Sequence, residues 1–467
     1  MSTKGLTFDF ASALAAWPGD EEAVTRACMN LLIDGLGVVS AGAVEEGPRL
    51  LAQLARNEGS RPVASVVGMG FATSAAQAAR INGVSMHVLD FEPMWNPPNH
   101  VLSTILSALL ALAEQREGEG KPPQGREMLR ALAKGVEAQG RLRVASKQYE
   151  PAKLLFHPPG VVGPIASAAA CATLLGLGVE KLAMAMSIAA SRASGLIANI
   201  GSMTKALHCG DAAMRGLEAA LLAQSGFTAD PDALGSPRGY GRAYYGAAFD
   251  PSGLAVPVET PRVLSPGMAW KLFPSQYGTH FAITAALDCR AEIDDAARIR
   301  SVRVTTPVMA YVDRPAPVSG LDGKFSFQYG VAAALLDARV DVATFTNQRC
   351  AAADMKAMLG KIELKQDESI AGTLDRMHVD VEVLLDDGRT VRHRCNAPEG
   401  SWSRPVGAER VRAKAASLLS STLGKEGSDR FWKLLDAGLG DLRIAPVMQL
   451  LQTPVDRPDP SSAAALV

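Results

Sequence analysis

The sequence predicts a mostly α-helical protein, with a large helical domain built from both ends of the chain and a smaller α+β domain between them. From about Glu21 to Leu222, apolar residues recur at helical spacing among many alanines and glycines, which is typical of closely packed helices. β-Branched residues become frequent from about Arg298 to Val312, and helical patterning returns after about Gly407. A chain of 467 residues with 48% hydrophobic content can bury cores of this size.

The helical domain is expected to comprise residues 1–268 and 406–453, the α+β domain residues 269–405, and a flexible tail residues 454–467. Helical spacing is clear over residues 162–175 and 212–222, and again over 411–423 and 430–439. Residues 226–268 are rich in Gly, Pro, Asp and Tyr, which predicts an ordered loop region. In the α+β domain, residues 377–385 and 391–395 alternate in polarity around Asp387-Gly388, which predicts a β-hairpin.

The composition limits the classes of protein that the chain can belong to. Lys and Arg number 47 against 48 for Asp and Glu, so no overall charge favours nucleic acid or an anionic membrane as a partner. The longest apolar run, residues 101–113, is too short to span a bilayer, and the first residues do not resemble a secretory signal. We therefore expect a cytoplasmic protein.

The cysteines are isolated from one another, with no C-x-x-C pair. This spacing argues against a zinc or iron–sulfur site and favours reduced, buried thiols. We expect no metal and no other cofactor. The cysteines are Cys28, Cys171, Cys209, Cys289, Cys350 and Cys395.

A first candidate site lies in the segment from His87 to His100, where Asp90 and Glu92 accompany the two histidines in a proline-interrupted loop. Asn99 is expected to cap the following helix, which would place His100 on its first turn, where the helix dipole favours an anion. The alternative interpretation is a surface loop with a hydrogen-bonded histidine.

Three further segments carry basic or imidazole side chains. His157 precedes Pro158-Pro159, so it is held on a stiff, extended backbone. Lys205 and His208 lie at the start of an alanine-rich helix, where a lysine can bind a carboxylate. Gln276 and His280 lie at the expected domain boundary, where ligands often bind, and Arg141 with Arg143 would add positive charge.

Together these segments offer carboxylates, imidazoles and fixed cations, which suit proton transfer next to a carboxylate. The sequence contains no G-x-S-x-G, Walker A or H-E-x-x-H motif. A rival interpretation is a nucleotide-dependent oxidoreductase, because Gly68, Gly70 and Thr73 follow a possible strand and Asp90 comes about twenty residues later. A non-catalytic helical scaffold is the other rival, and histidines in rigid loops disfavour it.

The four segments, in this order, resemble the MmgE/PrpD family over nearly the whole chain. The resemblance rests on these matches: His87-x-x-Asp90-Phe91 ending in His100, Gln139-Gly-Arg-Leu, Phe156-His-Pro-Pro-x-Val-Val-Gly163, Thr204-Lys205-x-Leu-His208-x-Gly210, Phe273-Pro with Thr279-His280, and Ser326-Phe-Gln-Tyr329. The stretches 311–319 and 326–336 and the segment around His157 are most similar to the cis-aconitate decarboxylase branch.

This resemblance implies a helical domain, an α+β lid domain, a homodimer, and catalysis without metal or coenzyme on a small polycarboxylate. The implied reaction is decarboxylation of cis-aconitate to itaconate, with dehydration of 2-methylcitrate as the alternative and epimerisation of a dicarboxylate as a more distant one. Two positions depart from the decarboxylase pattern: Met94 replaces a threonine and Gln276 replaces a histidine.

The resemblance also implies roles for individual residues. Asp90, His100, His157 and Lys205 would be catalytic: His157 would protonate carbon, His100 would orient the substrate, Asp90 would fix an imidazole, and Lys205 would meet developing negative charge. The expected substrate-binding residues are Arg141, His208, Gln276, His280 and Tyr329.

Overall fold

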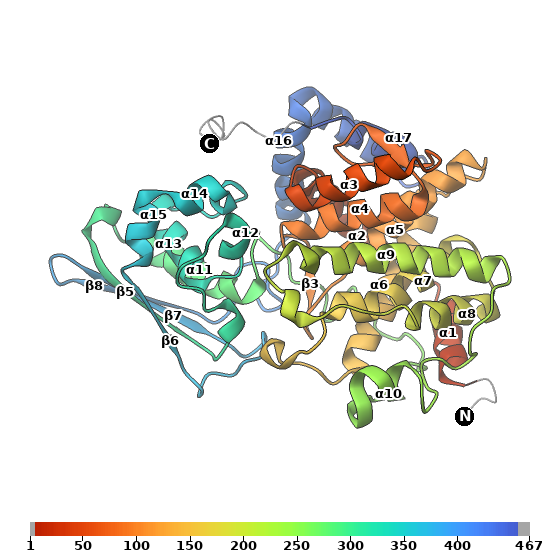
Figure 1. The fold of residues 1–467 in the computed structure, drawn as a ribbon, viewed down its shortest axis with the longest axis horizontal. Coiled ribbons are helices and arrows are strands. Elements are labelled where there is room, and N and C mark those ends of the chain that lie inside the picture. The colour runs from red at the N-terminus through yellow and green to blue at the C-terminus, as the bar shows by residue number, and fades with distance from the viewer. Residues whose placement is uncertain (1–4, 456–467) are drawn as a thin grey trace.

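The computed structural model describes residues 5–455, and its fold is mostly helical, as the sequence predicts (Figure 1). Buried apolar side chains form two large clusters. The first draws on residues 10–268 and 415–451, and the second on residues 269–395 together with Met94. The predicted tail at 454–467 lies almost entirely outside the described residues.

The first core is made by helices from both ends of the chain, and α16 packs against α2 and α17 (Figure 1). A Cβ at Gly37 of α2 would lie 2.9 Å from the Cα of Ala415, so glycine permits this close approach. The elements of this part are α1 (Leu6–Ala16), α2 (Glu22–Gly42), α3 (Glu46–Glu58), β1 (Ala64–Val66), β2 (Phe71–Thr73), α4 (Ala75–Val88), β3 (Met94–Trp95), β4 (Asn99–His100), α5 (Leu102–Gly118), α6 (Gly125–Ala145), α7 (Pro158–Leu174), α8 (Val179–Ala190), α9 (Met203–Gln224), α10 (Tyr240–Tyr245), α16 (Ala408–Leu435) and α17 (Ile444–Leu451).

Helix α2 is long and apolar enough to cross a membrane, although 72% of its most apolar window is buried inside the protein. That burial is what a core helix requires. Within α16, Gly424 has a non-helical backbone with a left-handed φ of 68°, so two helices meet at this residue, in agreement with the two helical stretches expected near the C-terminus.

The second core lies against one face of a four-stranded sheet of order β6-β5-β7-β8, in which β5 and β6 are parallel and the other pairs antiparallel. The predicted hairpin is confirmed as β7 and β8, and the inward residues of β7, such as Val381 and Val383, are fully buried. Helix α11 packs on β7 and β8. The elements are α11 (Tyr277–Ala291), β5 (Ile299–Thr306), α12 (Gly320–Gly323), α13 (Phe327–Asp337), α14 (Asn347–Ala351), α15 (Ala353–Leu359), β6 (Ile362–Gln366), β7 (Val379–Leu385) and β8 (Thr390–Cys395).

Irregular segments connect these elements. The predicted loop region at 226–268 holds only α10 and short 3₁₀ turns. All six cysteines are free and buried, as predicted. The 3₁₀ turns are η1 (Pro151–Lys153), η2 (Ile197–Asn199), η3 (Gly246–Ala248), η4 (Pro251–Gly253), η5 (Ala296–Arg298), η6 (Ala310–Val312) and η7 (Ala343–Phe345).

Two short hairpins correct the sequence analysis. Gly68 and Gly70 lie between the antiparallel strands β1 and β2, so the glycine-rich turn does not lead from a strand into a helix as a dinucleotide site requires. Asn99 and His100 form β4, which pairs with β3, and α5 begins only at Leu102. The prediction that Asn99 caps α5 is therefore wrong, because Asn99 and His100 pair with β3 instead.

Candidate active site

A cavity of about 360 Å³ is lined by residues of both the helical domain and the second domain. Apolar side chains such as Met94 and Phe325 make up much of its wall. The polar and charged residues that line it are Asp90, Asn99, His100, His157, Lys205, Lys271, Gln276, Tyr277, Tyr311 and Arg314.

An ion cluster centred on Asp90 forms one wall of the cavity. The Asp90 carboxylate accepts hydrogen bonds from the ammonium groups of Lys205 and Lys271, one on each oxygen. Nε2 of His100 lies 3.5 Å from the same carboxylate. Burial raises the pKa of Asp90. The positive charges of Lys205 and Lys271 outweigh this effect and hold the pKa of Asp90 well below its usual range. Asp90 is therefore an anion between two cations.

The backbone at Asp90 is strained and heavily supported. Helix α4 ends at Val88, and Asp90 turns the chain with a left-handed φ of 51°. Lys271 Nζ donates to the Asp90 carbonyl at 2.9 Å, and Lys414 of α16 donates to the Phe91 carbonyl at 2.6 Å. Non-glycine residues keep such a conformation only where their surroundings fix it. Lys271 of the second domain and Lys414 of α16 thus hold this turn from two directions.

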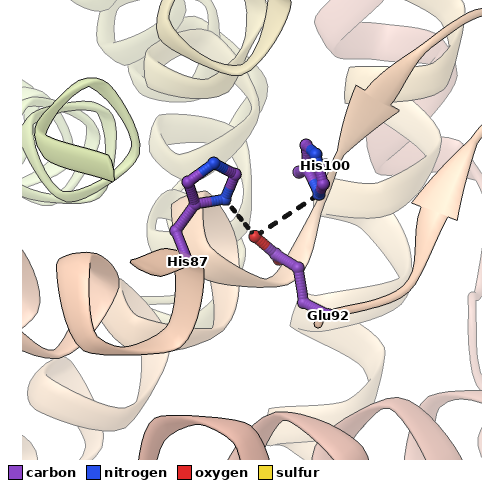
Figure 2. A group of neighbouring side chains, drawn as sticks. All are labelled: His87, Glu92 and His100. Atoms are coloured by element: carbon purple, nitrogen blue, oxygen red, sulfur yellow. Dashed lines mark hydrogen bonds and ion pairs between the residues drawn. The ribbon is translucent and has the colours of Figure 1, made fainter. Parts of the chain in front are cut away.

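Beside Asp90, two imidazoles face one carboxylate (Figure 2). Nδ1 of His87 lies 2.7 Å from Oε1 of Glu92, and Nδ1 of His100 lies 3.7 Å from it. The backbone N–H and the hydroxyl of Ser103 donate to the two Glu92 oxygens at 2.8 and 2.6 Å. Burial raises the pKa of Glu92 to about 7 and, together with nearby positive charge, lowers the pKa of both histidines well below normal. The imidazoles are therefore neutral near pH 7.

His87, Glu92 and His100 could also hold a metal ion, since one ligand atom from each lies within 4.8 Å of the others (Figure 2). Two histidines and a glutamate are a common zinc donor set. Two features oppose a cation here. Ser103 and His87 already occupy the Glu92 oxygens, and the positive charges of Lys205 and Lys271 act on both imidazoles. This charge arrangement favours a bound anion over a bound cation.

The starts of two helices position the remaining catalytic candidates. His157 is the N-cap residue of α7, on an extended backbone before Pro158-Pro159 as predicted, and its N–H donates to the Gly195 carbonyl at 3.0 Å. Lys205 lies in the first turn of α9. Burial, then the charge of Lys205, lowers the pKa of His157 well below normal.

The wall from the second domain carries side chains that engage one another. Gln276 donates from Nε2 to the Tyr311 hydroxyl at 2.9 Å, while its Oε1 accepts the Thr279 N–H at 3.3 Å and so caps α11. Arg314 pairs with Asp322 and donates from Nη2 to the Ile200 carbonyl of the helical domain at 3.2 Å. To turn toward a ligand, the Gln276 side chain would give up two hydrogen bonds and the Arg314 guanidinium up to three.

The structure brings Asp90, His100, His157, Lys205 and Gln276 to the cavity. His208 lies behind His157, with the two Nδ1 atoms 3.3 Å apart. His280 packs between Phe273 and Tyr277, outside the cavity lining.

Arg141 and Tyr329 correct the prediction. The Arg141 guanidinium pairs with Glu137 at 2.7 Å and donates to backbone carbonyls at Leu254 and Val256. The Tyr329 hydroxyl donates to the Thr344 carbonyl at 2.6 Å inside the second core. Neither residue lines the cavity, because each polar group is already bound elsewhere. Arg143, which donates to Ser146 and Gln148, is likewise internal.

Sequence reasoning gave no role to Lys271, Tyr311 and Arg314, which line the cavity, or to His87 and Glu92 behind it. Their position was the available signal: Lys271 lies at the expected domain boundary, and the other four lie inside segments named above. Their spatial convergence was not visible, because Lys271 meets Asp90 across 181 positions of the chain.

Two family models match the chain: the MmgE/PrpD N-terminal domain over residues 9–251 and the MmgE/PrpD C-terminal domain over residues 273–437. A cis-aconitate decarboxylase of Mus musculus is 30% identical over 478 residues, covering 100% of this chain and 97% of that protein. The Homo sapiens cis-aconitate decarboxylase is 31% identical, covering 90% of each. A 2-methylcitrate dehydratase of Escherichia coli K12 is 25% identical over 325 residues, covering 65% of each.

Proposed function

The chain belongs to the MmgE/PrpD family and is a lyase, and from this premise we propose that it decarboxylates cis-aconitate to itaconate and carbon dioxide. One observation carries the proposal. The cavity lining contains three cationic side chains, those of Lys205, Lys271 and Arg314, and one carboxylate, that of Asp90. The buried imidazoles of His100 and His157 in the same lining are neutral. A cavity with this excess of fixed positive charge suits a substrate with several carboxylates. Lys324, whose pKa burial lowers to about 8, adds a further amine behind the wall.

In the proposed reaction, the bond between the methylene carbon of cis-aconitate and its carboxylate breaks. The electron pair moves through the double bond to the carbon beside another carboxylate, and that carbon is then protonated. Lys205 and Lys271 meet the negative charge as it spreads onto this carboxylate. His157 lines the cavity and is the proposed proton donor, while His100 orients the substrate beside Asp90.

The alternative is dehydration of 2-methylcitrate, as in the more distant relatives. A base would take a proton beside a carboxylate while an acid protonates the departing hydroxyl. His157 and His100 could share these roles, because both imidazoles are neutral and line the same cavity. The higher identity to the decarboxylases over the whole chain favours the first reaction.

We further propose that the second domain acts as a lid, that the enzyme is a cytoplasmic homodimer, and that it needs neither metal nor coenzyme. The lid proposal is supported by Arg314, which donates from the second domain to the Ile200 carbonyl of the helical domain. The proposal that the enzyme needs no cofactor is supported by Lys205 and Lys271, whose ammonium groups already pair with the Asp90 carboxylate at the site.

The test is NMR of chelator-treated enzyme incubated separately with cis-aconitate and 2-methylcitrate. We expect itaconate from the first and no 2-methylaconitate from the second. Formation of 2-methylaconitate alone would replace the proposal with the dehydratase. Activity that requires added Zn²⁺ would overturn the cofactor-free claim and point to His87, Glu92 and His100 as ligands.

A further inference from the structure

A second imidazole stands directly behind the proposed proton donor. His157 and His208 face each other through their Nδ1 atoms at 3.3 Å, with ring planes inclined by 49°. His157 lines the cavity and His208 does not. Because Nδ1 of His157 is turned toward His208, Nε2 is the ring nitrogen that a substrate in the cavity can reach.

The surrounding backbone fixes both rings. The Gly195 carbonyl accepts the His157 N–H at 3.0 Å, and a Cβ at Gly195 would lie 3.1 Å from Cγ and Nδ1 of His208. Gly195 adopts a φ of +125°, which side-chain-bearing residues rarely adopt. One residue thus anchors the backbone of the first histidine and packs on the ring of the second. The pair is therefore set by the fold and is not a chance contact between mobile side chains.

The pairing matters because of the proton that the proposed decarboxylation consumes. Burial and the charge of Lys205 disfavour a doubly protonated His157. A neutral imidazole that gives up its Nε2 proton alone would become an anion, which is far less stable. It avoids this if its Nδ1 receives a proton from a neighbour in the same step. His208 is placed to supply it.

We propose that His208 is a positioning residue that relays a solvent proton to His157. The inference rests on the proposed function, because the relay serves protonation of the substrate carbon. Before the step, His208 carries the proton between the two Nδ1 atoms and His157 carries one on Nε2. The Nε2 proton passes to carbon, the shared proton moves onto Nδ1 of His157, and Nε2 of His208 takes a proton from water, whose hydroxide leaves to solvent. One proton enters and one is consumed. After product release, Nε2 of His157 takes a proton from solvent, the shared proton returns to Nδ1 of His208, and Nε2 of His208 releases its proton to solvent, which restores the starting tautomers.

The surroundings of His208 suit this direction. It is 9% exposed against 3% for His157, so it is the member of the pair nearer to solvent. Burial lowers the pKa of His208, and Lys205 and Arg215 add to this effect, while Asp211, one turn further along α9, opposes it. The pKa of His157 is held well below its ordinary value. A transient proton on His208 is therefore less costly than one on His157.

The first arm of the test needs no substrate. Histidine ring nitrogens are labelled with ¹⁵N, and the seven histidines are assigned by single substitutions. We expect His208→Ala to move the Nδ1 resonance of His157 while that of His393, which pairs with Glu292 elsewhere, stays in place. An unchanged His157 resonance would overturn the pairing, whatever the enzyme acts on.

The second arm measures turnover. We expect His208→Ala and His208→Asn to lower kcat by about 100-fold with KM changed less than about twofold, since proton transfer is worth this much in enzymes. An asparagine can donate to Nδ1 of His157 but cannot pass a proton on. Free imidazole in solution should raise kcat of the His208→Ala variant by about tenfold and should leave kcat of the His157→Ala variant unchanged. Wild-type kcat in His208→Asn would overturn the relay.

The two arms separate the two proposals. If the wild-type enzyme forms no itaconate but His157 still responds to His208→Ala, the pairing stands and the proposed function fails. His393→Ala serves as the control in both arms, and we expect it to leave the Nδ1 resonance of His157 in the first arm and kcat in the second unchanged.

Discussion

The two walls of the cavity are built differently. On the helical side, His157 and Lys205 lie at helix starts, and Asp90 lies in a turn that Lys271 and Lys414 hold from two directions. On the second-domain side, Gln276 and Arg314 bind neighbouring side chains and backbone that a ligand could replace. From this difference we propose that the helical wall performs the chemistry and that the second-domain wall recognises and encloses the substrate. Substitutions on the first should lower kcat, and those on the second should raise KM.

The largest effect is expected on the helical wall. His157→Ala should lower kcat by about 10³-fold with little change in KM, because it removes the proposed proton donor. Steady-state kinetics against cis-aconitate measures this, with His378→Ala in the second domain as a control that should retain wild-type kcat. A wild-type kcat in His157→Ala would remove this residue from the mechanism.

On the opposite wall, Arg314→Ala should raise KM by about 30-fold and leave kcat within about threefold, since a charge-assisted hydrogen bond contributes about 2 kcal/mol. Arg314→Lys keeps the charge and should recover part of the loss. Arg339→Ala, a surface arginine of the same domain, is the matched control. A fall in kcat with constant KM would contradict the assignment of this wall to recognition.

Lys271 joins the two walls, and its titration gives the third prediction. Burial lowers the pKa of Lys271 to about 8, with Asp90 opposing the shift. As the pH rises through about 8, the ammonium loses its proton and the cavity loses a positive charge. We expect kcat/KM to fall about tenfold per pH unit above that value, and kcat to fall less because a bound polyanion stabilises the ammonium. In Lys271→Arg, which stays charged, this alkaline limb should disappear. A flat profile to pH 10 in the wild type would contradict the role of Lys271.

The smallest effect concerns Gln276, which both caps α11 and binds Tyr311. Gln276→Leu should raise KM about fivefold through loss of the Tyr311 contact, and should lower the free energy of unfolding by about 1 kcal/mol through loss of the cap. Gln276→Ser keeps a cap but cannot reach Tyr311. It should therefore show the KM effect with near wild-type stability in denaturant unfolding. If Gln276→Leu and Gln276→Ser lowered the free energy of unfolding equally, loss of the cap would not explain the effect of Gln276→Leu.

The features that the sequence predicts correctly are those that depend on residues close together in the chain. Periodicity identified the helical domain and the hairpin of β7 and β8, because each depends on neighbouring residues in the chain. Proline and helix-start signals placed His157 and Lys205 correctly.

Interactions distant in sequence were not predictable. The sequence predicts Asn99 as a helix cap, but Asn99 pairs with Trp95 in a short hairpin instead. Arg141 looked like a substrate ligand, although Glu137 four residues earlier was a visible sign that its charge was already paired. The position of Lys271 at the domain boundary is visible in the sequence, but no local pattern predicts that its ammonium reaches Asp90 of the other domain.

The most direct test of the central claim is turnover of cis-aconitate in D₂O by the chelator-treated enzyme, with the product examined by NMR. The proposed mechanism predicts itaconate that carries one deuterium on its saturated methylene carbon, in a single configuration, because one fixed imidazole protonates one face. Itaconate with equal labelling of both faces, or no itaconate at all, would contradict it.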